Sequence, residues 1–202
     1  DGEWRPIDSD KDPTVILLHY PSILEDTINY IPPRVKIEIS CLSMDEPTEL
    51  RPIRSLIGES FDDEDTDAES FVRTVVPSRT FLEKLFLLAE EFQKEKPRSI
   101  RMSRHLYDLE KLMDTEYGKE ALSNRKLYDS IVEHRKAYYA LKYVNYDLHV
   151  PSTINFTIPE SVIEAWQDDY ADMRRFFIYG ESLEFDELMQ KMRELQQRVR
   201  II

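Results

Sequence analysis

The sequence predicts an α+β fold in which a strand-rich region, residues 1–78, precedes a helical domain, residues 79–202. In the first region, apolar residues form short runs or alternate with polar ones. From residue 78 onward they recur every three or four residues, which is the helical period. Strands followed by helices, rather than alternating with them, are typical of α+β proteins.

Three short segments are predicted to be strands. Residues 13–20, PTVILLHY, are rich in side chains that favour strands. Residues 34–42, RVKIEISCL, alternate apolar and polar side chains, as a strand with one buried face does. Residues 71–77, FVRTVVP, end in a proline, which cannot donate to a β ladder. Between these segments, residues 44–60 are rich in turn residues and are expected to form a loop.

Five segments are predicted to be helices because their apolar residues recur at helical spacing. The first has Ser78 or Thr80 as its N-cap and stops at Pro97. The fourth has Pro159 in its first turn, where proline is favoured. In chain order the five are residues 78–96, 101–114, 123–143, 159–178 and 181–200.

Composition narrows the classes of function. Only four glycines occur among 202 residues, and there is no Gly-x-Gly-x-x-Gly or Gly-Lys-Ser/Thr sequence, so a glycine-rich phosphate loop is excluded. The single cysteine, Cys41, excludes an internal disulfide and fits a reducing compartment. No apolar run approaches the roughly 18 residues of a membrane span. We therefore expect a cytoplasmic protein.

The net charge of −13 is distributed unevenly. Residues 1–70 carry 6 basic and 18 acidic side chains, residues 71–142 carry 15 and 11, and residues 143–202 carry 6 and 11. Only the middle third is positively charged, so only there is a polyanion attracted. This distribution disfavours a general nucleic-acid-binding protein but leaves room for a local phosphate site.

An acidic segment at residues 58–70, GESFDDEDTDAES, looks like a metal site, because a Gly-x-Ser turn precedes aspartates spaced two apart from Asp63 to Asp67. A metal-binding Asp-x-Asp strand needs apolar residues between its carboxylates, so that its other face packs on the core. Here Glu64 and Thr66 intervene. Crowded acidic side chains without a Lys or Arg favour solvation. We therefore interpret the segment as a solvated loop.

Lys36 and Glu38 project from the same face of their predicted strand. The simplest interpretation is the exposed face of an antiparallel strand, and the functional alternative is a carboxylate placed to assist a metal or a nucleophile. Lys84, near the start of the first predicted helix, presents the same choice. It is either a surface charge or a point charge that holds a phosphate.

The clearest functional stripe lies on the second predicted helix. Four polar residues share one face at i, i+3, i+4 and i+7, namely Arg101, Arg104, His105 and Asp108. A basic stripe with an embedded carboxylate suits a triphosphate or RNA phosphate, with Asp108 free to orient Arg104 or to act on a proton. The alternative is an exposed face with an Arg104–Asp108 ion pair worth a few tenths of a kcal/mol. The pattern alone does not decide between them.

Several segments in this order are similar to a known family: RVKIEIS, RPIRSLI, VPSRTFLEKLFLL, RHLYDLEKL and WQDDYADMRRFFIYGESLEFDELMQKM. They resemble the AbiE-type (AbiEii/AbiGii) abortive-infection toxins, a branch of nucleotidyltransferase-like proteins. The most specific piece runs from Arg104 to Leu109, supported by Glu83 and Lys84. The resemblance implies the remainder of a polymerase-β-like nucleotidyltransferase sheet followed by a C-terminal helical bundle. It also implies nucleotide transfer from an NTP to RNA, with tRNA the leading target, Mg²⁺ as cofactor and a cognate antitoxin as partner.

Carried over by motif, the resemblance implies roles for four residues. Glu38 resembles a metal-binding carboxylate on a late strand of the core, and Lys84 resembles a lysine that contacts nucleotide phosphate. Arg104 and Asp108 match an Arg-x-x-x-Asp pair in which the aspartate has the essential acidic role. The catalytic candidates are therefore Lys84, Arg104 and Asp108. The phosphate-binding candidates include Lys84 and Arg104. Strand and helix geometry adds three more, Lys36, Arg101 and His105.

One part of the family pattern is missing. Such proteins carry a Gly-Ser or Gly-Gly-Thr turn and an Asp-x-Asp strand upstream of the strand at residues 34–42. Residues 1–33 supply neither, because Asp8, Asp10 and Asp12 lack apolar alternation. We therefore expect the chain to be the C-terminal portion of a longer toxin and to be inactive by itself. The alternative is a non-catalytic helical module that binds an antitoxin or RNA.

Overall fold

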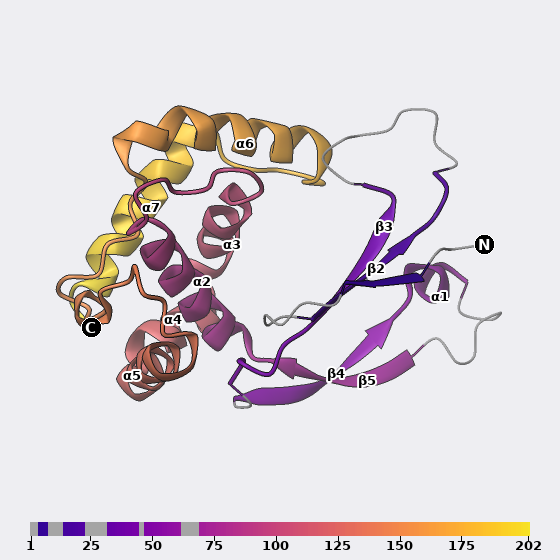
Figure 1. Cartoon of the computed structure of the whole chain (residues 1–202), viewed down its shortest axis with the longest axis horizontal. Coiled ribbons are helices and arrows are strands. Elements are labelled where there is room, and N and C mark those ends of the chain that lie inside the picture. The colour runs from indigo at the N-terminus through magenta and orange to yellow at the C-terminus, as the bar shows by residue number, and fades with distance from the viewer. Residues whose placement is uncertain (1–3, 8–13, 23–31, 45–46, 62–68) are drawn as a thin grey trace.

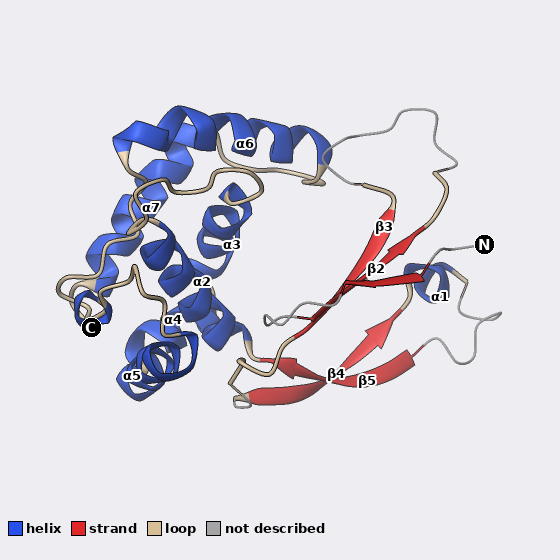
Figure 2. Ribbon diagram, viewed as in Figure 1, coloured by secondary structure: helices blue, strands red, loops and turns tan. Residues whose placement is uncertain are grey.

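A computed structural model describes residues 4–7, 14–22, 32–44, 47–61 and 69–202 (Figure 1). Within them the strands precede the helices, apart from one short helix between the fourth and fifth strands (Figure 2). This mixed α and β content, with antiparallel sheets, agrees with the predicted α+β class. In the described part of the chain, no helix combines the length and apolar character needed to cross a membrane.

The strands form two small antiparallel sheets. The first contains, in spatial order, β1 (Trp4–Ile7), β2 (Thr14–His19) and β3 (Arg34–Ile39). The second pairs β4 (Thr48–Arg54) with β5 (Glu69–Val75), with the short helix α1 (Leu56–Ser60) between them in sequence.

Both sheets leave apolar side chains exposed. Val35, Ile37 and Ile39 on β3 are 50, 41 and 53 % exposed, and Leu50 and Phe71 on the second sheet are 69 and 65 % exposed. The alternation predicted for β3 is therefore present in its residue types, but the described part of the chain does not bury its apolar face. The two sheets contribute little to the hydrophobic core.

The helices beyond residue 76 form a separate body around α2 (Pro77–Glu91). The helices that follow it are α3 (Ser103–Met113), α4 (Glu116–Ser123), α5 (Arg125–His134), α6 (Ile163–Phe176) and α7 (Phe185–Val199). A π-helix, η1 (Arg135–Tyr139), continues α5, and the 3₁₀ turns η2 (Tyr146–Leu148) and η3 (Glu160–Val162) lie between α5 and α6. Helix α2 contacts α3, α4 and α5, and α3 also contacts α4, α6 and α7, so these two helices connect the others (Figure 1).

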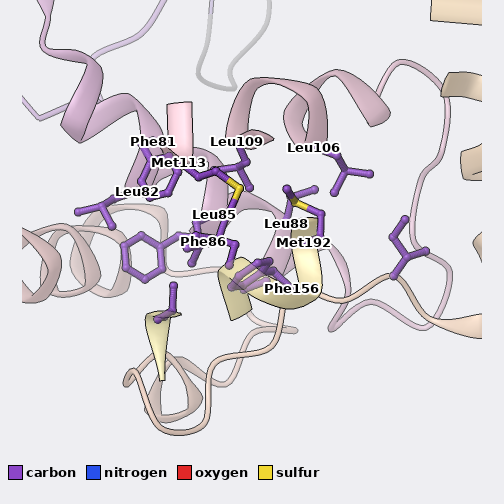
Figure 3. Close-up of a cluster of buried hydrophobic side chains, with 14 of the residues drawn as sticks. Phe81, Leu82, Leu85, Phe86, Leu88, Leu106, Leu109, Met113, Phe156 and Met192 are labelled. Atoms are coloured by element: carbon purple, nitrogen blue, oxygen red, sulfur yellow. The ribbon is translucent and has the colours of Figure 1, made fainter. Parts of the chain in front are cut away.

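The hydrophobic core lies in this helical body. Wherever burial is described, every buried hydrophobic side chain lies at or beyond Phe81. Figure 3 shows side chains of α2 gathered with those of α3, α7 and the segment before α6, among them Leu85, Leu109, Met192 and Phe156. Burial of each such side chain stabilises the folded state by about 1.5–3 kcal/mol. The helical body therefore supplies most of the hydrophobic stabilisation.

Hydrogen bonds join β4 and the segment after β3 to the helical body. His134 Nε2, at the end of α5, lies 2.6 Å from the carbonyl oxygen of Leu42. Because a carbonyl can only accept, the imidazole nitrogen is the donor. Arg51 Nη2 on β4 donates to the Tyr117 hydroxyl on α4 at 3.5 Å. The segment after β3 is thus fastened to the helices, and Met44 packs against their core.

The structure confirms the three predicted strands. It corrects the prediction for the segment between the second and the third. Residues 44–60, expected to be a loop, contain β4 and α1. Pro47 and Pro52 account for the error, because prolines signal turns in a sequence. In the structure Pro52 lies within β4, and a two-stranded sheet tolerates it because each strand has a free edge.

The five predicted helices are present, with three corrections. Pro77, expected to close a strand, is the first residue of α2, and Val76 rather than Ser78 or Thr80 is the N-cap. The third predicted helix ends as an α-helix at His134 and continues as η1. A short helix that was not predicted, α4, precedes it.

The acidic segment falls partly outside the described residues. Its first three residues, 58–60, belong to α1, and its last two, 69–70, begin β5. The aspartates from Asp63 to Asp67 lie outside the described residues, as do Asp8, Asp10 and Asp12. The solvated-loop interpretation therefore stays a prediction.

Candidate active site

Helices α2 and α3 bring Lys84 and Asp108 together. Lys84 Nζ lies 2.6 Å from Asp108 Oδ2, an ion pair that links the two helices. The lysine side chain is 23 % exposed and the aspartate side chain 36 %, so a ligand can reach both from solvent. These two catalytic candidates are 24 positions apart in the sequence, and the structure places them in direct contact.

Arg104 lies one helical turn before Asp108 on α3 and is exposed. The Arg104–Asp108 ion pair considered from the sequence is not present, because Asp108 pairs with Lys84 instead. Arg104 forms no ion pair with the described residues. An available guanidinium therefore lies on α3, the helix that carries Asp108, an arrangement that suits a ligand with more than one negative charge.

His105 differs from the prediction. The stripe placed it on an exposed helix face, but it is buried, and its Nδ1 has no hydrogen-bond partner. Burial, together with the positive charges of Lys84, Arg104 and Arg98, lowers the pKa of His105 to about 3. The imidazole is consequently neutral at pH 7. It can donate or accept a hydrogen bond but adds no positive charge for a phosphate.

Arg101 is not on the helical stripe, because α3 begins two residues later at Ser103. Its backbone is left-handed, with φ of 58°, and its N–H donates to Asp169 Oδ1 on α6. The other oxygen of Asp169 accepts from the Ser103 N–H at 3.0 Å and from the Ser103 hydroxyl. Met102, the N-cap residue, offers no capping side chain, so Asp169 caps α3 from a neighbouring helix.

Arg79 and Glu83 form a second polar pair in the first turns of α2. Arg79 Nε donates to Glu83 Oε1 at 2.8 Å. The Arg79 side chain is only 1 % exposed, and its Nη1 has no hydrogen-bond partner. Glu83, noted from the sequence beside Lys84, therefore holds a buried arginine and not the lysine. The roles of Arg79 and Asp169 were not predicted. The i, i+4 spacing of Arg79 and Glu83 was the one available signal.

Lys36 and Glu38 lie on β3, which runs apart from α2 and α3 in Figure 1. As predicted, they share one face, and Lys36 Nζ lies 2.7 Å from Glu38 Oε1. In the register they stand opposite Leu17 and Val15 of β2. The structure therefore does not bring these two candidates into the Lys84–Asp108 cluster.

Among the described residues, no group of three His, Cys, Asp or Glu side chains is placed to hold a metal ion. Glu38 has the oxygen donors that a hard divalent cation prefers, but its described neighbour is the cation Lys36. The described part of the chain thus contains no complete metal centre.

Comparison with known families decides the assignment. The family model described as "Nucleotidyl transferase AbiEii toxin, Type IV TA system" matches residues 3–191. The chain belongs to this family. No curated protein sequence and no solved structure matches it.

Membership in the AbiEii family confirms the resemblance based on sequence motifs. The match spans both the strands and the helices, so the two parts belong to one family pattern. It also includes α2 and α3, which carry the Lys84–Asp108 pair.

Proposed function

We propose that the protein contributes the helical part of a nucleotidyltransferase active site, in which Lys84, Arg104 and Asp108 act on a nucleoside triphosphate. The observation that carries the proposal is the ion pair between Lys84 and Asp108, because it gathers the two motif residues at an accessible position on α2 and α3. The family assignment supplies the reaction type.

In nucleotidyl transfer an acceptor oxygen attacks the α-phosphorus of the nucleotide, and the bond to the bridging oxygen of the β-phosphate breaks. Negative charge then develops on the departing pyrophosphate. Lys84 and Arg104 would bind this charge, since fixed cations at the point of charge development are effective catalytic groups. Asp108 holds the lysine ammonium in place before the nucleotide arrives. In this role Asp108 positions Lys84 and needs no proton transfer of its own.

The remaining phosphate-binding candidates, Lys36, Arg101 and His105, take lesser roles in this proposal. Lys36 lies on β3, away from the helical cluster. Arg101 supports α3 through its backbone contact with Asp169. His105 is neutral and serves at most as a hydrogen-bonding group beside Lys84.

Nucleotidyl transferases use divalent cations to bind nucleotide phosphates, and Mg²⁺ suits that role. We propose Glu38 as one ligand because the family resemblance implies it; it would bind the metal from the strand side, since it lies on β3 with Lys36 and apart from the helical cluster. Further carboxylates must come from outside the described residues or from another chain. The exposed apolar residues of β3 and of the second sheet support this view, because exposed apolar surface is normally covered by polypeptide.

We therefore propose that residues 1–78 belong to a polymerase-β-like sheet completed by additional polypeptide, and that residues 79–202 form the helical domain. The chain by itself would not transfer nucleotides. Within the complete toxin, the nucleotide donor is an NTP and the acceptor is RNA, with tRNA the leading class. A cognate antitoxin would be the protein partner, and the reaction would occur in the cytoplasm.

A second candidate function is a non-catalytic module that binds an antitoxin. The open apolar faces of the two sheets favour it, because an exposed apolar surface can receive a protein partner as well as further strands. In that case the Lys84–Asp108 pair would only join two helices.

The Asp108→Asn variant of the complete toxin separates the two functions. The assay follows transfer of labelled nucleotide to RNA. The matched control is Asp129→Asn on α5, which removes a carboxylate from an exposed ion pair with Arg125. We expect Asp108→Asn to lower the transfer rate roughly 100-fold or more and the control to leave it unchanged. Equal rates for wild type and Asp108→Asn would refute the catalytic proposal and favour the binding module.

A further inference from the structure

The segment after α5 presents exposed aromatic rings among basic side chains. Tyr138 is 63 % exposed and Tyr143 44 %, and Lys136 and Lys142 are exposed beside them in sequence. Residues 124–143 contain five Lys and Arg against two Asp and Glu, and of these five Arg125, Arg135 and Lys136 pair with Asp129, Glu90 and Asp147. We call Lys136, Tyr138, Lys142 and Tyr143 the aromatic-basic surface.

The Tyr138 ring is held in a fixed orientation. It stacks on the ring of His134, with centroids 4.6 Å apart and planes inclined by 26°. His134 is itself fixed by its hydrogen bond to the Leu42 carbonyl oxygen. One face of the tyrosine is thus supported, and the remainder of the ring is open to solvent.

The backbone under this surface is anchored in the core. Arg135, the first residue of η1, is buried, and its Nε donates to Glu90 Oε1 at 2.7 Å. The Tyr139 ring lies 4.6 Å from the Arg135 guanidinium carbon, and Lys94 Nζ lies 5.3 Å from the centre of the Tyr143 ring. A π-helix is a rare element that often marks a functional position. Because the segment is fixed, its rings do not need to be ordered when a ligand binds.

We propose that the aromatic-basic surface binds single-stranded RNA. Unpaired bases would stack on Tyr138 and Tyr143, and Lys136 and Lys142 would contact phosphates. Aromatic rings interleaved with cations are what single strands require, since every base has a flat face and every linkage a negative charge. The inference rests on the proposed function in that RNA is the acceptor there, and it adds the surface that would hold it.

The charges on this surface favour RNA over a protein partner. Lysine is depleted in the cores of protein interfaces, whereas here a lysine lies close to each ring in the sequence. Lys136 Nζ lies 3.2 Å from Asp147 Oδ1, and these two side chains are 62 and 82 % exposed. An exposed pair of this kind is weak in water, so a phosphate can replace Asp147.

The test measures binding of a fluorescently labelled 12-nucleotide oligouridylate RNA to the chain by anisotropy, without nucleotide or metal. The variants are Tyr138→Ala and Tyr143→Ala, each paired with the Phe variant that keeps the ring. The matched control is Tyr179→Ala, because this tyrosine is 97 % exposed and lies between α6 and α7. Unchanged circular dichroism would show that each variant is folded.

We expect each Ala variant to weaken binding roughly tenfold, as loss of one stacked base does, and the Phe variants and Tyr179→Ala to bind like wild type. Lys136→Ala and Lys142→Ala should each reduce the salt dependence of binding by about 0.7 in log–log slope. Absence of salt-dependent RNA binding by the wild type would overturn the proposal. So would wild-type affinity in both Ala variants.

This test is independent of the catalytic proposal. Asp108→Asn should leave RNA binding intact, because the aromatic-basic surface does not include α3. If Asp108→Asn transfers nucleotide normally while Tyr138→Ala loses RNA, the proposed catalytic role fails and the RNA surface stands. The reverse pattern would remove the surface and leave the catalytic role.

Discussion

Lys84 on α2 and Asp108 on α3 form an ion pair with a separation of 2.6 Å, and each side chain is partly accessible to solvent. The pair connects two motifs that lie 24 positions apart, within the region matched by the AbiEii family. It lies beside the exposed Arg104 and the neutral, buried His105. The Lys84 ammonium is held by the Asp108 carboxylate, and the second cation, Arg104, lies on the same helix as that carboxylate. Such a pair of cations is suited to a nucleotide phosphate.

Removing the Asp169 carboxylate should destabilise the protein by about 1–3 kcal/mol, because the N–H groups of Arg101 and Ser103 would lose their acceptor. Thermal unfolding of Asp169→Ala measures the effect. Asp168→Ala is the control, because Asp168 is the exposed neighbour of Asp169 and carries the same charge on the same helix. If both variants unfold at the same temperature, Asp169 is not the cap of α3.

Gly118→Ala should also destabilise the fold, by about 1–3 kcal/mol. An added Cβ would lie 2.3 Å from the Leu112 carbonyl oxygen and 2.8 Å from the Met113 Cα, both backbone atoms. Helix α4 would therefore have to move away from the end of α3. Denaturant unfolding of Gly118→Ala and of the exposed neighbour Lys119→Ala provides the comparison, and equal stability of the two would contradict the close approach.

Stability should fall as the pH falls from about 6.5 to about 3, partly because of His105. Its folded-state pKa is about 3 against an ordinary value of 6.5, so between these values only the unfolded chain takes up the proton. Over that range protonation of His105 in the unfolded chain lowers the free energy of unfolding by roughly 1.4 kcal/mol for each unit that the pH falls. Burial lowers the pKa of His149 as well, so some slope should remain without His105.

Chemical unfolding of His105→Gln between pH 4.5 and 7 tests this expectation. The variant should show a clearly shallower dependence on pH than the wild type, and His19→Gln, at an exposed position of β2, should not. A slope identical to that of the wild type would mean that His105 is charged or accessible in the folded protein.

The buried pair of Glu90 and Arg135 should respond asymmetrically to mutation. Arg135→Met leaves an uncompensated carboxylate in the core and should cost about 3–5 kcal/mol. The double variant Glu90→Leu with Arg135→Met should recover most of that loss, because it removes both charges. Unfolding free energies of the single and double variants are the measurement. A double variant less stable than Arg135→Met would show that the pair itself is strongly stabilising.

The helices were predictable because burial follows the periodic pattern. Leu85, Leu88, Leu106 and Leu109 are all buried, as their spacing indicated. The strand β4 was not predictable, because Pro47 before it and Pro52 within it are residues typical of turns, and its partner β5 begins only at Glu69. Pairing between segments that are distant in the sequence leaves no signal in either segment alone.

The candidate site was predictable in its residues more than in its contacts. Motif resemblance named Lys84, Arg104 and Asp108, but only packing of α2 against α3 shows that the lysine, and not the arginine, is the partner of Asp108. Helical spacing also placed Arg101 and His105 on one exposed stripe. The prediction failed for Arg101 because the helix starts at Ser103, where Asp169 from α6 caps it. It failed for His105 because that side chain is buried.

The most direct measurement is a double-mutant cycle on nucleotide transfer to RNA by the toxin, with Lys84→Ala, Asp108→Asn and the two combined. Each single variant should lose roughly 100-fold or more in rate. Because the two residues act as a unit, the double variant should be scarcely slower than either single one. Wild-type rates in the single variants would contradict a catalytic role for the pair. If the rate losses of the two single variants multiply in the double variant, Lys84 and Asp108 do not act as a unit.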